Sequence, residues 1–205
     1  MGYRGLLLLD VDGPLNPYAA KPNARPPGYE TFRYTPAGGW YTGRDVRRHK
    51  GLRVWLNPGH GALLLELAAA TGLELVWATT WSHEANTLIA PAVGLPELPV
   101  IDFPDADLER DEAGHARWSR DGGWKWSAVV RYAAGRPLAW LDDEHDDTGA
   151  RAAGATFDRD RADSPTLLCH VDPYRGLQPA HLDRIRAWAV RLPDRGHDRP
   201  PLACA

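Results

Sequence analysis

The sequence predicts an α/β fold in which a mostly parallel central sheet lies between two layers of helices. Short apolar runs of strand length recur along the chain, and the segments between them carry apolar residues at helical spacing. Strands that alternate with helices in this way favour a parallel sheet that is covered on both faces. The predicted strands of this sheet lie at residues 6–9, 73–78, 99–101, 138–141 and 166–170.

The length and composition are those of one globular domain. A chain of 205 residues that is 43% hydrophobic and 25% charged can bury a full α/β core. We expect a single domain over residues 1–192 and a flexible tail over residues 193–205, which are rich in Pro, Arg and Asp.

The net charge, the cysteines and the first residues speak against several classes of protein. A formal net charge of −3 gives no overall attraction to nucleic acid or to an anionic membrane. The two cysteines, Cys169 and Cys204, have neither the spacing of a metal site nor that of a disulfide framework. The four leucines before Asp10 are too few for a signal or membrane segment. We therefore expect a cytoplasmic protein with no membrane partner, and the sequence leaves its oligomeric state open.

The segment after the first strand is predicted to be an insertion, residues 14–52, that forms a small cap or flap. Six prolines between residues 14 and 36 exclude a long helix there. Residues 29–35 and 40–42 are rich in aromatic residues and threonine and flank a Pro-Ala-Gly-Gly turn, which predicts a β-hairpin. A basic cluster follows at residues 44–53, and residues 54–56 form another short predicted strand.

The remaining elements follow from apolar periodicity and from residues that start or stop helices. Asn57-Pro58 is a typical helix start, and Gly72 and Gly135 are typical stops. A second insertion, residues 102–123, comes after the third predicted strand. The predicted helices lie at residues 58–71, 84–93, 126–133, 146–153 and 182–192.

Polar residues stand where three of the predicted strands end. Because the carboxyl ends of parallel strands meet at one edge of a sheet, where α/β proteins bind ligands, we expect these side chains to converge. A lysine directly before the helix at 126–133 is expected to join them. The residues are Asp10 and Asp12, Thr79 and Thr80, Asp142 and Asp143, and Lys125.

These residue types together suit phosphoryl transfer. A carboxylate can attack phosphorus to form an aspartyl-phosphate, and a second carboxylate can protonate the leaving oxygen and later activate water. Carboxylates at close quarters need a hard cation such as Mg²⁺, which takes oxygen ligands. Hydroxyl and ammonium groups bind the remaining phosphate oxygens.

The same residues resemble the four motifs of the haloacid dehalogenase (HAD) superfamily of phosphatases and phosphotransferases, in the order of that family. Asp10-Val-Asp-Gly is similar to its first motif, Thr79-Thr80 to the second, Lys125 to the third and Asp142-Asp143 to the fourth. More narrowly, Leu9-Asp-Val-Asp-Gly-Pro-Leu-Asn-Pro and Trp77-Ala-Thr-Thr-Trp-Ser-His-Glu-Ala-Asn resemble the HAD domain of Swiss Army knife RNA-repair proteins. The resemblance extends from residue 6 to about residue 170.

The resemblance implies a Rossmann-like three-layer HAD fold and a Mg²⁺-dependent phosphomonoester hydrolase that acts on a phosphorylated substrate through an aspartyl-phosphate. Asp10 would be the nucleophile and Asp12 the general acid/base. Thr79, Thr80 and Lys125 would bind the phosphate.

The resemblance also implies the metal ligands. Asp10 would bind through its side chain and Asp12 through its backbone carbonyl, while Asp142 would complete the site. Asp143 would assist through water or by orienting a neighbour. A further acid of the family would correspond to Asp146 or Asp147, for which a helix-capping role competes because acids are favoured in a first helical turn.

Three other functions compete with this one. A signalling receiver domain also uses aspartates, a threonine and a lysine, but there the acidic pair comes before the other two, whereas Asp142-Asp143 comes last. A catalytically inactive phosphate-binding module would not need Asp12. A phosphatase or phosphotransferase for a small metabolite such as a sugar phosphate stays open.

The substrate is predicted only loosely, as a nucleotide or nucleic-acid end phosphate. Neither insertion is large enough to enclose a small substrate, and the basic cluster at 44–53 suits a phosphate backbone. His83 and His145 show no ligand spacing and are expected to have structural roles. Three tryptophans flank the second and third motifs and are candidates for base stacking: Trp81, Trp124 and Trp126.

Overall fold

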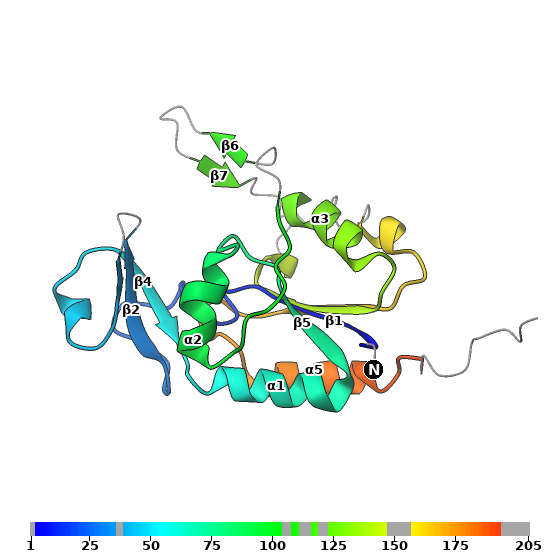
Figure 1. The fold of residues 1–205 in the computed structure, drawn as a ribbon, viewed down its shortest axis with the longest axis horizontal. Coiled ribbons are helices and arrows are strands. Elements are labelled where there is room, and N and C mark those ends of the chain that lie inside the picture. Colours follow the sequence, from blue (N-terminus) through cyan, green and yellow to red (C-terminus); the bar gives the residue numbers. More distant parts are fainter. Residues whose placement is uncertain are drawn as a thin grey trace, which may run out of the picture.

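The computed structural model describes residues 3–35, 39–103, 108–110, 116–118, 123–146 and 157–193. Four parallel strands form the central sheet (Figure 1), which confirms the predicted α/β class. In sheet order these strands are β5 (Leu73–Trp77), β1 (Gly5–Leu9), β8 (Leu138–Asp142) and β9 (Thr166–His170).

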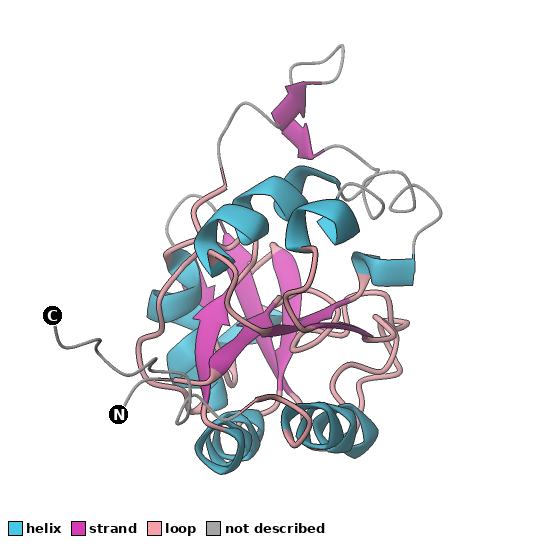
Figure 2. Ribbon diagram, turned by 90° about the vertical axis from the view of Figure 1, so that its right-hand side faces the viewer, coloured by secondary structure: helices cyan, strands magenta, loops and turns pink. Residues whose placement is uncertain are grey.

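The central sheet separates two apolar layers (Figure 2), because successive side chains of each strand point to opposite faces. On one face, Leu7 and Leu9 of β1 belong to the core cluster that also holds buried residues of α1 and α5. On the other face, Leu6 and Leu8 lie with buried residues of α3. The helices are α1 (His60–Thr71), α3 (Gly123–Ala133) and α5 (Pro179–Ala189).

A second, antiparallel sheet forms beside the carboxyl end of β1 and is called the cap sheet here. The predicted hairpin forms its strands β2 (Glu30–Thr35) and β3 (Gly39–Tyr41). The predicted strand at 54–56 is longer than expected and pairs with β2 as β4 (Leu52–Leu56). A short 3₁₀ helix, η1 (Asp45–Arg47), connects β3 to β4.

Two predicted elements differ in detail from the structure. Residues 99–101 contribute a single parallel bridge, between Val100 and Trp77, rather than a full strand. Pro99 accepts a hydrogen bond from the Trp77 N–H but has none to donate, which limits the ladder. Helix α1 begins at His60 rather than Pro58, since the Asn57 side chain accepts a hydrogen bond from Gly59 N–H at 2.9 Å and forms a turn first. Helix α1 stops at Gly72, which adopts the left-handed conformation, as predicted.

The other segments complete the chain. The helix predicted at 84–93 consists of a π-helical turn, η2 (Ala85–Ile89), followed by α2 (Ala90–Val93). In the second insertion, β6 (Leu108–Arg110) pairs antiparallel with β7 (Ala116–Trp118).

Of the helix predicted at 146–153, only residue 146 is described, in the 3₁₀ turn η4 (Glu144–Asp146). Nearly all of the predicted tail also lies outside the described residues. Within the described residues, no helix has the length and apolar character needed to cross a membrane.

Candidate active site

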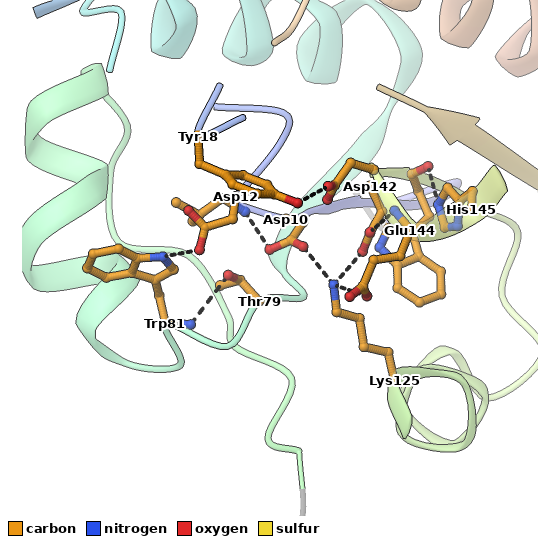
Figure 3. A network of polar contacts seen from close by, with 12 residues as sticks. Asp10, Asp12, Tyr18, Thr79, Trp81, Lys125, Asp142, Glu144 and His145 are labelled. Carbon is orange, nitrogen blue, oxygen red and sulfur yellow. Dashed lines mark hydrogen bonds and ion pairs between the residues drawn. The ribbon is translucent and has the colours of Figure 1, made fainter. Parts of the chain in front are cut away.

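The carboxyl ends of β1 and β8 lie side by side, because these two strands are hydrogen-bonded neighbours in the sheet. Asp10 directly follows β1, and Asp142 is the last residue of β8. Lys125, on the first turn of α3, reaches both of them from the face of the sheet that α3 covers (Figure 3). The parallel sheet thus brings together three residues that are up to 132 positions apart, as the strand-end pattern predicts.

The Lys125 ammonium stands at the centre of an ionic cluster. Its Nζ lies 2.6 Å from Asp10 Oδ2, 2.8 Å from Asp142 Oδ2 and 3.0 Å from Glu144 Oε2. The lysine side chain is only 3% exposed. Burial by itself lowers its pKa, but the negative charges around it outweigh burial and hold the pKa well above the usual range.

Three carboxylates, called the carboxylate trio here, lie close enough to share one cation. Asp10, Asp142 and Asp143 each offer an oxygen, and these oxygens lie within 4.8 Å of one another. Burial, followed by the charge of Asp10, raises the pKa of Asp143 to about 7. Burial also holds the pKa of Asp142 well above its usual range, although Lys125 opposes the shift. A single ammonium does not offset this negative charge, so the donor set fits a hard divalent cation such as Mg²⁺.

The first and fourth motifs pack tightly against each other. Gly13 has a φ of +86°, and a Cβ placed on it would lie 2.6 Å from side-chain atoms of Asp143. Glycine is therefore required here both for backbone conformation and for space. Tyr18 donates a hydrogen bond from its hydroxyl to Asp143 Oδ2 at 3.0 Å, which holds this carboxylate against the first motif.

The Asp12 carboxylate is not part of the trio and is held by its own two hydrogen bonds. Its Oδ1 accepts a hydrogen bond from Asn16 Nδ2 at 2.7 Å, and its Oδ2 accepts one from Trp81 Nε1 at 3.0 Å. Burial and the nearby Asp10 raise the pKa of Asp12 to about 6, against the opposing effect of those two hydrogen bonds. A carboxyl group with a pKa near neutrality suits general acid/base catalysis. Metal binding by the Asp12 backbone carbonyl stays a prediction.

A cavity of about 240 Å³ opens over these groups. Thr80 lines it, whereas Thr79 is fully buried and its hydroxyl accepts a hydrogen bond from Trp81 N–H at 3.4 Å. Of the two predicted threonines, Thr80 is thus the one exposed to a ligand in this state. The full lining is Asp10, Asp12, Asn16, Tyr18, Leu52, Thr80, Lys125, Asp143 and Glu144.

Four of these lining residues were not predicted from the sequence. Asn16 lies within the first quoted motif run and Glu144 within the acidic run after β8, so both carried a weak signal. Tyr18 and Leu52 belong to the insertion at 14–52, where nothing in the sequence distinguishes them. Asp147, one of the two further acids considered, lies outside the described residues, as does the side chain of Asp146.

Trp81 and Trp126 are buried, so neither presents a face for base stacking, and that prediction is wrong for both. The side chain of Trp124 lies outside the described residues. His83 Nε2 lies 3.2 Å from Asp102 Oδ1, and both side chains are exposed. His145 is held by the Trp140 carbonyl at 3.1 Å, and burial lowers its pKa to about 3. Neither histidine lines the cavity.

Comparison with known proteins supports the family resemblance. A family model described as the HAD domain in Swiss Army Knife RNA repair proteins matches residues 6–182, which includes all four motifs. No match was found among curated proteins or among solved structures. The family indicates a phosphatase-type hydrolase, and the carboxylate trio is a possible metal site in keeping with it. With the fold, the four motifs and this match in agreement, the chain belongs to the HAD domains of the kind found in Swiss Army Knife RNA repair proteins.

Proposed function

We propose that this protein is a Mg²⁺-dependent phosphomonoester hydrolase that forms an aspartyl-phosphate on Asp10. The observation that carries the proposal is the arrangement around the 240 Å³ cavity. Two members of the carboxylate trio, Asp10 and Asp143, line it together with Lys125, and the third, Asp142, is buried and paired with Lys125. A separately held carboxylate, Asp12, lines the same cavity.

The chemistry proceeds in two displacements. In the first, an Asp10 oxygen bonds to phosphorus and the bond to the leaving oxygen breaks, while Asp12 gives its proton to that oxygen. In the second, Asp12 takes a proton from water, the water oxygen bonds to phosphorus, and the bond to Asp10 breaks. Lys125 and Thr80 face the phosphoryl oxygens and offset their charge. Bound Mg²⁺ would neutralise the carboxylate trio and polarise the phosphoryl group.

Metal binding should be visible without turnover, as a rise in Tm on adding Mg²⁺. At a concentration about 100-fold above Kd, linkage adds about 2.7 kcal/mol, which for a chain of this length is roughly 5–10 °C. Asp142→Asn should lose most of this Mg²⁺-dependent rise, because it removes one carboxylate of the trio. Asp183→Asn, an exposed change on α5, should keep it. An equal rise in wild type and Asp142→Asn would place the metal elsewhere.

For the substrate, we propose a nucleotide or nucleic-acid end. The cap sheet is a small three-stranded structure, and the cavity beneath it is open to a large leaving group. Tyr18 and Leu52 line the cavity and are 48% and 52% exposed, so they present an aromatic ring and an aliphatic side chain beside the phosphate position. The leaving group is then a nucleoside or a nucleic-acid end, and its flat base fits such a surface. Tyr18 thus replaces the buried tryptophans as the candidate stacking residue.

Arg47 and Arg48 of the basic cluster lie farther from the cavity than their sequence position suggests. Helix η1, which contains Arg47, lies on the outer side of the cap sheet, beyond β2 and β4 as seen from the central sheet (Figure 1). Arg47 and Arg48 are exposed there. These arginines would meet the backbone of an oligonucleotide that runs over the cap sheet, and would not meet a mononucleotide in the cavity.

The salt dependence of KM tests this placement. For a 5′- or 3′-phosphorylated oligonucleotide, KM should rise steeply with salt by counterion release, and for a mononucleotide much less. Replacing both Arg47 and Arg48 with Ala should reduce the slope of log KM against log salt by roughly 1.4 for the oligonucleotide. The same variant should hydrolyse 4-nitrophenyl phosphate normally. A protein that prefers sugar phosphates and shows no salt dependence would instead be a small-metabolite phosphatase.

A further inference from the structure

We propose that the cap sheet positions the general acid/base: it holds Trp81 and Asn16, which in turn hold the two carboxylate oxygens of Asp12. The inference rests on the proposed role of Asp12. It assigns Trp81 and Asn16 as positioning residues and gives the cap sheet a part in the chemical step, beyond covering a substrate.

The Asp12 carboxylate is held from two directions. Asn16 Nδ2 donates to Oδ1 and Trp81 Nε1 donates to Oδ2, at 2.7 and 3.0 Å (Figure 3 shows the second). Rotation of the carboxylate about its Cβ–Cγ bond would break both hydrogen bonds. One donor comes from the turn after β1 and the other from the segment after β5, so the hold depends on how these segments are placed relative to each other.

Trp81 is fixed by two strands of the cap sheet. Its side chain packs against Tyr34 of β2, at a ring-centroid distance of 5.3 Å, and edge-on against Trp40 of β3, at 6.3 Å. Trp40 is itself stacked on Phe32 of β2 at 4.9 Å. The Tyr34 hydroxyl lies 3.1 Å from both carboxylate oxygens of Glu84, which ties the segment after Trp81 to β2 as well. With only 7% of its surface exposed, Trp81 has little freedom to turn its N–H away from Asp12.

Asn16 is fixed by the third strand of the cap sheet. Its Oδ1 accepts a hydrogen bond from Trp55 N–H of β4 at 3.0 Å. Because that interaction occupies the carbonyl side of the amide, the amide is oriented with Nδ2 toward Asp12. The backbone of Asn16 is also anchored, since its N–H donates to Val11 O at 2.8 Å and its carbonyl accepts from Gly13 N–H at 2.9 Å. All three strands of the cap sheet therefore contact a residue that binds Asp12.

The consequence concerns proton transfer and not phosphate binding. A general acid must present its proton to the leaving oxygen, so loss of orientation harms reactions that need that proton. A leaving group that is stable as an anion departs without help. Weakening the hold on Asp12 should therefore steepen the dependence of kcat/KM on leaving-group pKa, whereas general structural damage lowers kcat/KM for all leaving groups alike.

Trp81→Phe is the direct test, assayed with phenyl phosphate and 4-nitrophenyl phosphate. The variant keeps an aromatic ring but removes the N–H donor. We expect kcat/KM for phenyl phosphate to fall about tenfold more than for 4-nitrophenyl phosphate, a part of the 10²–10⁴-fold that general acid catalysis supplies. Trp188→Phe, at a buried tryptophan of α5, makes the same change in ring size and should show no such selectivity. In an Asp12→Asn background, Trp81→Phe should add no further selectivity.

Two further variants keep the test decisive if Trp81→Phe does not fold. Asn16→Ala removes both the donor to Asp12 and the acceptor for Trp55 N–H without adding a charge beside Asp12, and should give the same selective loss. Trp40 packs on Trp81 but does not bind Asp12 or line the cavity. A selective loss of activity on phenyl phosphate in Trp40→Leu would therefore show that the cap sheet acts through Trp81.

The possible failures are distinguishable. In one outcome, hydrolysis depends on Asp10, and Asp12→Asn changes the leaving-group selectivity, but none of the folded Trp81, Asn16 and Trp40 variants does. That outcome would overturn this inference and leave the proposed function intact. A folded wild-type protein that hydrolyses no phosphomonoester with Mg²⁺ would overturn the proposed function and the inference with it.

Discussion

Replacing Asp10 with Asn is expected to reduce turnover of every phosphomonoester to background, a loss on the order of 10⁴-fold or more. Asn has the same shape but lacks the negative oxygen that attacks phosphorus. The backbone N–H of Val11 and the Lys125 ammonium both donate to the Asp10 carboxylate and hold it in place, at 2.6 Å each. The amide oxygen can still accept one of these two bonds. Lys125 also keeps its contacts with Asp142 and Glu144, so the substitution should leave the strand end folded.

The measurement is steady-state turnover together with trapping of the covalent intermediate by acid quenching. Wild type should carry phosphoryl label on Asp10, and Asp10→Asn should carry none. Asp183→Asn is the matched control, since it makes the same chemical change at an exposed position on α5. Near-normal turnover by a folded Asp10→Asn protein would show that another group attacks phosphorus.

Replacing Asp12 with Asn is expected to lower kcat by about 10²–10⁴-fold while largely preserving Mg²⁺ binding. The amide can neither protonate the leaving oxygen nor accept a proton from water, so both displacements slow. It also conflicts with its surroundings: Asn16 and Trp81 both present donors, and an amide has one acceptor oxygen to offer them. Metal affinity should survive because the Asp12 side chain is not part of the carboxylate trio.

Calorimetric titration with Mg²⁺ separates the two effects. We expect the Kd of folded Asp12→Asn to stay close to that of wild type, while Asp142→Asn loses most of its affinity. Complete loss of Mg²⁺ binding in folded Asp12→Asn would mean that the Asp12 carboxylate itself is a metal ligand, contrary to its orientation in the structure.

Local sequence patterns predict most of the elements of the fold. The leucine run of β1, the apolar run of β5 and the glycine after α1 each depend on interactions within a few residues, so the sequence predicts them closely. The cap hairpin followed from its turn and flanking aromatic residues in the same way. The pairing of β4 with the cap sheet was not predicted, because a short apolar strand carries no signal that names its partner.

The sequence by itself determined that Asp10 and Asp142 would meet, because parallel strands bring their carboxyl ends to one edge whatever surrounds them. The tertiary structure alone decided what surrounds them. Leu9 pairs with Trp77 in the sheet, and this register brings the segments after β1 and β5 together, where Trp81 donates to Asp12. This contact joins residues 69 positions apart and depends on strand register, strand order and side-chain rotamer together. No local sequence pattern predicts any of these.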